Sequence, residues 1–140
     1  MALDIELREA QLYRILMEVF GRERIVAQAR ISFVCSGKLP DLCPEMNPGY
    51  AEWAERFRCL FTVVNNEDEP RLVVEFLSDF TDFVDIREAE RDRYLPEVLR
   101  QQGIHYMTVS NAEFGELLSA ESALHFLHLM ETKFGDEIVA

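Results

Sequence analysis

The hydrophobic and polar positions change their period along the chain, most clearly in its second half. Residues 71–77 form a short, mostly apolar run, and residues 86–102 then repeat apolar positions at helical spacing. Gly103 ends that helix, and the β-prone run 104–109 follows it. A strand, a helix and a second strand in this order predict a βαβ crossover in which the two strands lie parallel.

The first half of the chain predicts one long helix, one strand and one short helix. Residues 3–20 repeat apolar positions at helical spacing, and residues 24–34 alternate as a half-buried strand does. Residues 35–49 hold three prolines and form a loop, after which residues 49–56 predict a short helix anchored by Trp53. The apolar face predicted for the strand consists of Ile25, Ala27, Ala29, Ile31 and Phe33.

Two further strands, 58–64 and 72–76, are joined by the polar turn 65–70 and therefore predict an antiparallel hairpin. The second of them is apolar on both faces, which is typical of a central strand.

The last part of the chain predicts three helices. Pro96 lies inside the pattern of 86–102, so we expect a kink there, or two helices that meet at Tyr94. Ser-Asn-Ala-Glu at 110–113 is a capping box that opens a short helix. A final helix spans 119–134, and its predicted apolar side consists of Leu124, Phe126, Leu127 and Met130.

The elements follow the order α-β-β-β-α-β-α-α. This order predicts an α/β fold in a single domain, 1–140, with a mixed sheet of about four strands and helices on both faces. The net charge of −12 repels phosphate, so it argues against nucleic acid and favours a protein partner or self-association as a homo-oligomer.

The cysteines and the N-terminal residues indicate the cellular compartment of the protein. The chain has three cysteines with no paired spacing, which predicts reduced thiols, with Cys59 in the core and Cys35 and Cys43 exposed beside the proline loop. Asp4 and Glu6 stand where a signal peptide would be basic, and no apolar run reaches membrane-spanning length. We therefore expect a cytoplasmic protein without a membrane segment.

Four short sequence features occur on particular elements of this predicted order. They are Glu9 in the first helix, Glu75 on the third strand, Arg91-Asp92 in the crossover helix and Gly103-Ile104 before the last strand. With these features, residues 4–115 resemble the PD-(D/E)xK, or restriction-endonuclease-like, nuclease superfamily, and most of all its small bacterial domains without a settled role. The resemblance implies a fold built around a Mg²⁺-dependent phosphodiesterase site.

The chain departs from that family pattern at the catalytic positions. Leu60 stands where the metal-binding Asp is expected, Leu77 where the second acid or the Lys is expected, and Leu95-Pro96 where Lys-Asp is expected. A Mg²⁺ site needs several oxygen ligands to activate water, and leucine offers none. The resemblance thus implies a pseudo-enzyme that needs no cofactor and acts as an interaction or regulatory module, with remnant catalytic residues Glu9, Glu75 and Asp92.

Two alternatives stay open. A working Mg²⁺-dependent nuclease would combine Glu9 and Glu75 with an acid of 79–85, and Glu75, Asp79 and Asp82 are the candidate metal ligands. Against this, Glu75 can face solvent or pair with an arginine such as Arg93, and Asp85 can cap the following helix. In the second alternative the resemblance is chance and the chain is an unrelated binding domain.

A weaker metal-ligand pattern lies on the last helix. His125 and His128 are three residues apart and Glu121 precedes His125 by one turn, but no third histidine or cysteine is placed nearby, so a surface or partly buried pair is the better interpretation. An interaction module needs an exposed apolar patch, for which Phe80, Phe83 and the final helix are the candidates. No acyl-transfer motif and no Gly-rich phosphate loop occurs in the sequence.

Overall fold

The computed structural model describes residues 2–42, 45, 47–77, 86–118 and 121–135. Its elements are α1 (Ala2–Phe20), a 3₁₀ turn η1 (Arg22–Arg24), β1 (Ile25–Arg30), α2 (Ile31–Val34), α3 (Tyr50–Arg56), β2 (Arg58–Val64), β3 (Pro70–Phe76), α4 (Ile86–Gln102), β4 (His105–Val109), α5 (Asn111–Leu117) and α6 (Ser122–Phe134). The strands form one sheet in the order β1-β2-β3-β4. The predicted α/β fold with a four-stranded mixed sheet is confirmed.

The pairing of the strands agrees with the predicted hairpin and crossover. β1 and β2 are antiparallel, as are β2 and β3, whereas β3 and β4 are parallel. The parallel pair keeps one register from Leu72 opposite His105 to Phe76 opposite Val109. Because β3 is paired on both sides, it is the central strand that its apolar sequence predicts.

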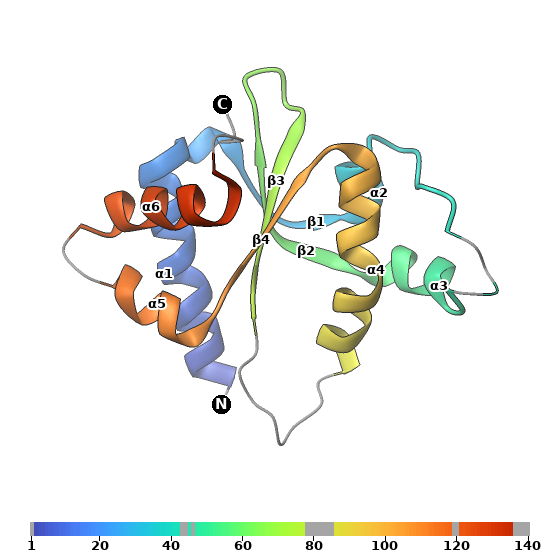
Figure 1. Ribbon diagram of the computed structural model, residues 1–140, viewed down its shortest axis with the longest axis horizontal. Coiled ribbons are helices and arrows are strands. Elements are labelled where there is room, and N and C mark those ends of the chain that lie inside the picture. Colours follow the sequence, from blue (N-terminus) through green and yellow to red (C-terminus); the bar gives the residue numbers. More distant parts are fainter. Residues whose placement is uncertain (1, 43–44, 46, 78–85, 119–120, 136–140) are drawn as a thin grey trace.

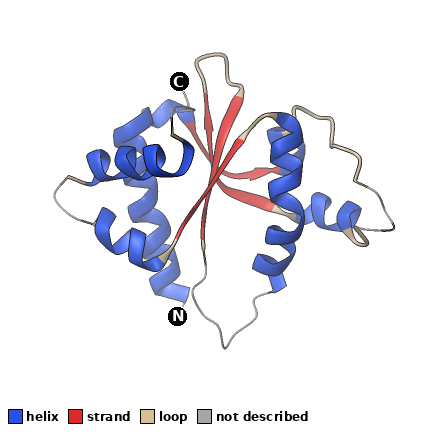
Figure 2. Ribbon diagram, viewed as in Figure 1, coloured by secondary structure: helices blue, strands red, loops and turns tan. Residues whose placement is uncertain are grey.

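Helices cover both faces of the sheet. Figures 1 and 2 show α1, α5 and α6 on one side and α2, α3 and α4 on the other. We call the cluster under α1, α5 and α6 the first core and the cluster under α2, α3 and α4 the second core. The largest fully buried apolar side chains of the first core are Leu12, Leu16, Leu72, Met107, Leu117, Phe126 and Met130, and those of the second are Ile31, Trp53, Leu95 and Leu99.

β1 is shorter than predicted. The strand ends at Arg30 and one turn of helix, α2, follows it, so the prediction of a strand to residue 34 was wrong. Gln28 has a φ of 56°, in the left-handed region. This conformation changes the face of the sheet towards which the following side chains point. Ile25 before it packs in the first core, whereas Ala29 after it packs in the second. The residues predicted to share one apolar face therefore pack on both faces of the sheet.

Three other features of the helices and the proline loop differ from the predictions. α4 runs through Pro96 as a single helix, so the predicted alternative of two helices that meet at Tyr94 was wrong, while the kink stays a prediction. On α6, Phe126 and Met130 are buried but Leu124 and Leu127 are 49% and 44% exposed, so only part of the predicted apolar side packs in the core. Cys35 is buried rather than exposed, whereas Cys43 lies outside the described residues.

The predicted capping box and short α3 helix are present. Ser110 Oγ accepts a hydrogen bond from Glu113 N, and the Glu113 carboxylate accepts one from Ser110 N. Trp53 is buried in α3 beside the ring of Tyr94. In the part of the chain that the structure describes, no helix is long and apolar enough to cross a membrane.

Candidate functional site

Glu75 is the candidate residue with the most unusual surroundings. It lies near the end of β3, one residue before Phe76, and only 1% of it is exposed. Val73 packs in the second core and Val74 in the first, so alternation along the strand directs Glu75 towards α4. A carboxylate in such a place requires partners within the protein.

Both carboxylate oxygens of Glu75 have partners. Leu60 N donates to Glu75 Oε2 at 2.6 Å, and Arg91 Nη1 lies 3.5 Å from Glu75 Oε1. The first contact crosses from β2 to β3, and the second crosses from α4 to the sheet. Leu60 is the residue that the resemblance implies at the position of a metal-binding aspartate, and its main-chain N–H donates to the carboxylate of Glu75.

Arg91 joins α4 to the end of the sheet. Its side chain is 1% exposed, its Nη1 donates to Phe76 O at 2.7 Å, and its Nε and Nη2 donate to Asp92 Oδ1 at 3.0 and 2.9 Å. Burial, the largest single influence, lowers the pKa of Arg91, but Tyr106, Asp92 and Glu75 together raise it above its ordinary value. The guanidinium therefore stays charged and neutralises the buried carboxylate.

Tyr106 of β4 completes the group, which we call the Glu75 cluster: Glu75, Arg91, Asp92 and Tyr106. The phenol oxygen of Tyr106 is buried and has no hydrogen-bond partner among the described residues. Burial raises the pKa of Tyr106, and the nearby carboxylates raise it further against the opposing effect of Arg91. The phenol therefore keeps its proton throughout the neutral range.

The structure brings two of the three expected catalytic remnants together and leaves the third apart. Glu75 and Asp92 both contact the guanidinium of Arg91. Glu9 lies on α1, which covers the opposite face of the sheet from α4. The other expected ligands, Asp79 and Asp82, lie outside the described residues, as do Asp85, Phe80 and Phe83. Among the described residues there is no group of three or more His, Cys, Asp or Glu side chains that could hold a metal.

Of the two alternatives for Glu75, exposure to solvent was wrong, and pairing with an arginine was right except that the partner is Arg91 and not Arg93. Arg93 lies on the exposed side of α4, over the ring of Tyr94 at 5.6 Å. The signal that identifies Arg91 is helical spacing: it precedes the buried residues Tyr94, Leu95 and Val98 by three, four and seven positions. Tyr106 carried no such signal, because its role depends on the register of β4.

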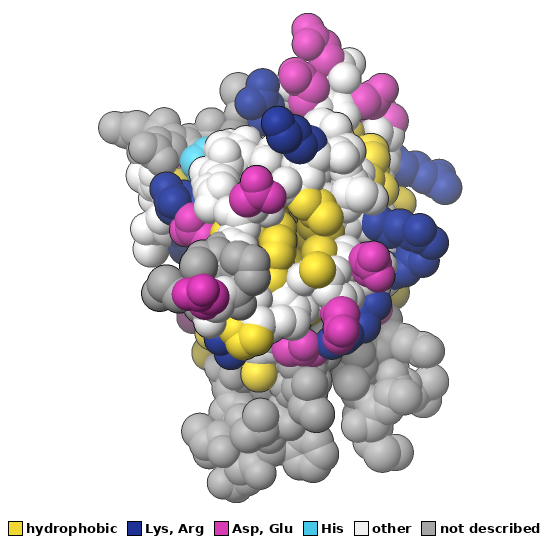
Figure 3. Space-filling model, turned by 90° about the vertical axis from the view of Figure 1, so that its right-hand side faces the viewer, with side chains coloured by type: hydrophobic (Ala, Val, Ile, Leu, Met, Phe, Trp, Pro, Cys, Tyr) yellow, Lys and Arg dark blue, Asp and Glu magenta, His cyan; other side chains and the backbone are white. Residues whose placement is uncertain are grey.

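The described acidic and basic side chains are interspersed on the face formed by α2, α3 and α4. Figure 3 shows them there around a small apolar patch. A phosphate backbone is held by a run of basic side chains. The described part of this face therefore offers mixed charge rather than a continuous basic track.

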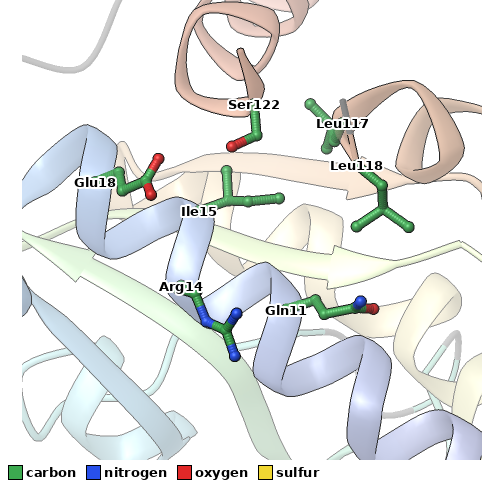
Figure 4. A pocket seen from close by; sticks show the side chains of 7 residues that line it. All are labelled: Gln11, Arg14, Ile15, Glu18, Leu117, Leu118 and Ser122. Carbon is green, nitrogen blue, oxygen red and sulfur yellow. The ribbon is translucent and has the colours of Figure 1, made fainter. Parts of the chain in front are cut away.

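A shallow hollow of about 150 Å³ lies on the other side of the molecule, between α1, the end of α5 and the start of α6 (Figure 4). Ile15 and Leu117 are buried there, while Arg14 and Glu18 lie one helical turn apart along its α1 side. Ser122 supplies a hydroxyl to this hollow, but Glu18 is the one carboxylate among the described residues that line it, so they offer no pair of acids for acid–base catalysis.

The histidines of α6 do not converge on a common centre. His125 Nδ1 lies 3.1 Å from Glu116 O, and the side chain of His128 is exposed. Their arrangement is that of a surface pair on one helix.

No family model matches the chain, and searches of curated proteins and of solved structures found no match either.

Proposed function

We propose that this chain is a catalytically degenerate domain of the restriction-endonuclease-like type that acts as a protein-interaction or regulatory module. The observation that carries the proposal is the state of Glu75. The carboxylate that would bind Mg²⁺ in an active relative is 1% exposed, accepts a hydrogen bond from Leu60 N and pairs with Arg91. The residue thus serves as a structural anchor between α4 and the sheet.

The charges of the cluster support the same proposal. A metal ion at Glu75 would have to displace Arg91, whose guanidinium is also bonded to Phe76 O and to Asp92. Opening that network would leave a buried cation beside the incoming one, which costs several kcal/mol, on the order of the penalty for an unpaired buried charge. The buried cluster therefore favours the inactive form over the metal-bound one.

The alternative is a Mg²⁺-dependent nuclease with an unusual acidic site. The pairing of Glu75 with Asp92 through one arginine favours it to a limited extent, because removal of the arginine side chain would leave two neighbouring carboxylates. The net charge of −12 and the mixed charge of the α4 face weigh against a nucleic-acid substrate.

The experiment that separates these functions is a calorimetric titration of Mg²⁺ and of Mn²⁺ into the metal-free full chain. We expect no saturable binding at millimolar metal. Glu75→Gln keeps an oxygen for Leu60 N and removes the charge, while Glu97→Gln, on the exposed side of α4, is the matched control. Saturable binding that Glu75→Gln abolishes and Glu97→Gln preserves would overturn the proposal, and cleavage of DNA or RNA would then be tested.

A further inference from the structure

The two edges of the sheet are built differently. An edge strand exposes unpaired N–H and C=O groups, and proteins commonly protect it with bulges, charges or a covering element. β1 has such protection: Gln28 leaves the extended conformation with a φ of 56°, and Arg58 Nη1 lies over its carbonyl oxygen at 3.4 Å. The pairing of β1 with β2 is interrupted at that residue.

β4 shows none of these protections in the described structure. Its five residues, His-Tyr-Met-Thr-Val, include no proline and no Asp, Glu, Lys or Arg, and they keep an unbroken register with β3. Tyr, Thr and Val are residues that favour strands. In Figure 1, β4 lies at the front of the sheet, and no described helix or strand crosses in front of it.

The hydrogen-bond pattern identifies the groups on the open side. Leu77 N donates to Val109 O at 2.8 Å, so the carbonyl of Val109 points towards β3. Because the main-chain groups of successive strand residues point to alternate sides, those of Met107 also face β3, while those of Tyr106 and Thr108 face outwards. Among the described residues, these outward N–H and C=O groups have no partner strand.

Side chains on both faces of the sheet beside this edge can contact the side chains of a further strand. On the α6 side, the rings of His105 and Phe134 lie 4.9 Å apart and both are half-buried. On the α4 side, Tyr106 and Thr108 are half-buried. A strand added here would place its side chains alternately against these two surfaces.

We propose that the outer edge of β4 binds an extended segment of a protein partner as a fifth strand, and that this segment is neutral or basic with apolar side chains at alternate positions. The inference rests on the proposed function as an interaction module and names its binding surface. The charge of the segment follows from the chain's net charge of −12, which attracts cationic peptides. The same charge opposes pairing of two β4 edges from two copies, since each copy carries −12.

The test uses two substitutions at one position of the full chain. Thr108→Pro removes an outward N–H without removing a bond to β3, and proline is tolerated where an edge N–H faces solvent. Thr108→Val keeps that N–H and is the matched control. The probe is a library of random short peptides displayed on phage and selected on the wild-type chain, after which the enriched peptides are synthesised and their affinities are measured for all three proteins.

We expect enriched peptides that alternate apolar and neutral or basic residues. Thr108→Pro should weaken their binding about tenfold or more, and Thr108→Val should change it little. Amide exchange of the wild-type chain gives a second measurement that needs no variant. The amides of Tyr106 and Thr108 should exchange faster than those of Met107 and Val109 in the free chain and become protected when the peptide binds.

Three results would overturn the inference. They are peptides insensitive to Thr108→Pro, slow exchange of the Tyr106 and Thr108 amides in the free chain, and a wild-type dimer that Thr108→Pro dissociates. The last result would assign the edge to a second copy. Peptides that bind elsewhere would remove the edge from the proposal and leave the interaction module standing, whereas saturable metal binding at Glu75 would remove the module itself.

Discussion

The two faces of the sheet are stabilised by different chemistry. The first core, under α1, α5 and α6, consists of apolar side chains. All three buried polar or charged residues of the described chain, Thr62, Glu75 and Arg91, lie on the other face. Thr62 belongs there because it is opposite Val73, which packs in the second core. The same face holds three buried side-chain atoms that have no hydrogen-bond partner among the described residues: Trp53 Nε1, Thr62 Oγ1 and Tyr106 OH.

This difference teaches how the two layers of helices are positioned. Apolar burial is roughly proportional to area and has little directional preference, so α1 and α6 can adjust their positions without losing much of it. An ion pair with hydrogen bonds demands fixed geometry. Arg91, bonded to Phe76 O and paired with Glu75, therefore fixes α4 along the sheet in a way that leucines do not.

The largest expected effect comes from breaking the buried pair. Arg91→Met removes the guanidinium and leaves Glu75 buried without its counter-charge, which should lower the free energy of unfolding by about 3–5 kcal/mol. Urea denaturation at neutral pH measures the loss. Arg100→Met, on the same helix but in an exposed pair with Glu97, should change stability by less than about 1 kcal/mol. Equal losses for the two variants would contradict a special role for Arg91.

The double variant Glu75→Gln/Arg91→Met makes the second core more like the first. The glutamine still offers an oxygen to Leu60 N, and neither buried charge remains. We expect it to recover about 2 kcal/mol or more of the loss caused by Arg91→Met alone, since replacing both partners of a buried pair is often close to neutral. A double variant no more stable than Arg91→Met would mean that the two residues act independently.

A smaller effect is expected from the hydroxyls without partners. Thr62→Val and Tyr106→Phe each remove a buried oxygen that makes no hydrogen bond within the described structure. Each should leave stability unchanged or raise it by about 1 kcal/mol, because the cost of desolvating the hydroxyl disappears. Thr132→Val, whose exposed hydroxyl is bonded to His128 O, is the control. A loss above about 1 kcal/mol at either buried site would show that its hydroxyl has a partner in solution.

The polar contacts near the first core lie at its margin and should respond to pH weakly. Burial, the largest influence, raises the pKa of Glu113, but bonds from Ser110 and Lys133 outweigh it and lower the pKa below 4.5. Its contribution to stability is therefore complete above pH 4.5 and is lost as the pH falls through the lowered pKa.

Glu113→Gln tests this contribution with the capping geometry kept. The variant should be about 0.5 kcal/mol less stable than wild type at pH 7 and equal to it in strong acid. Urea titrations at a series of pH values measure the difference, and Lys133→Met should reproduce part of it. A gap between Glu113→Gln and wild type that does not shrink on acidification would contradict the assignment.

The smallest effect concerns a thiol and leaves stability untouched. Burial raises the pKa of Cys35 to about 11, so little thiolate forms near neutral pH. Iodoacetamide at pH 8 should leave Cys35 unlabelled in the folded chain and label it in urea, as peptide mass spectrometry would show. Rapid labelling of Cys35 in the folded chain would mean that the second core opens readily.

The elements that rest on side-chain periodicity and local motifs could be predicted from the sequence. The bounds of β2, the hairpin to β3 and the Ser110 capping box all follow from patterns that only neighbouring residues determine. The turn of the chain at Gln28 could not be predicted in this way. A left-handed glutamine leaves no periodic trace, so the alternation from Ile25 to Phe33 suggested one face instead of two.

The candidate site was predictable in its parts but not in its assembly. Glu75 stood out as an acid in an apolar strand, and a partnering arginine was one of two alternatives for it, beside exposure to solvent. Which arginine it was depended on the rotation of α4 about its axis, and the contribution of Tyr106 depended on the register of β4. The exposure of Leu124 and Leu127 was missed for a related reason. The apolar residues of a helix do not by themselves indicate which side of the helix packs against the core.

The strands occupy the sheet in the order in which they occur along the chain. Each strand after β1 therefore meets a neighbour that has already left the ribosome, and no place between two strands has to be kept open for a later segment. The antiparallel pairs β1–β2 and β2–β3 can form during synthesis, before α4 and β4 have emerged. The parallel strand β4 then joins a sheet that already exists and covers the edge of β3.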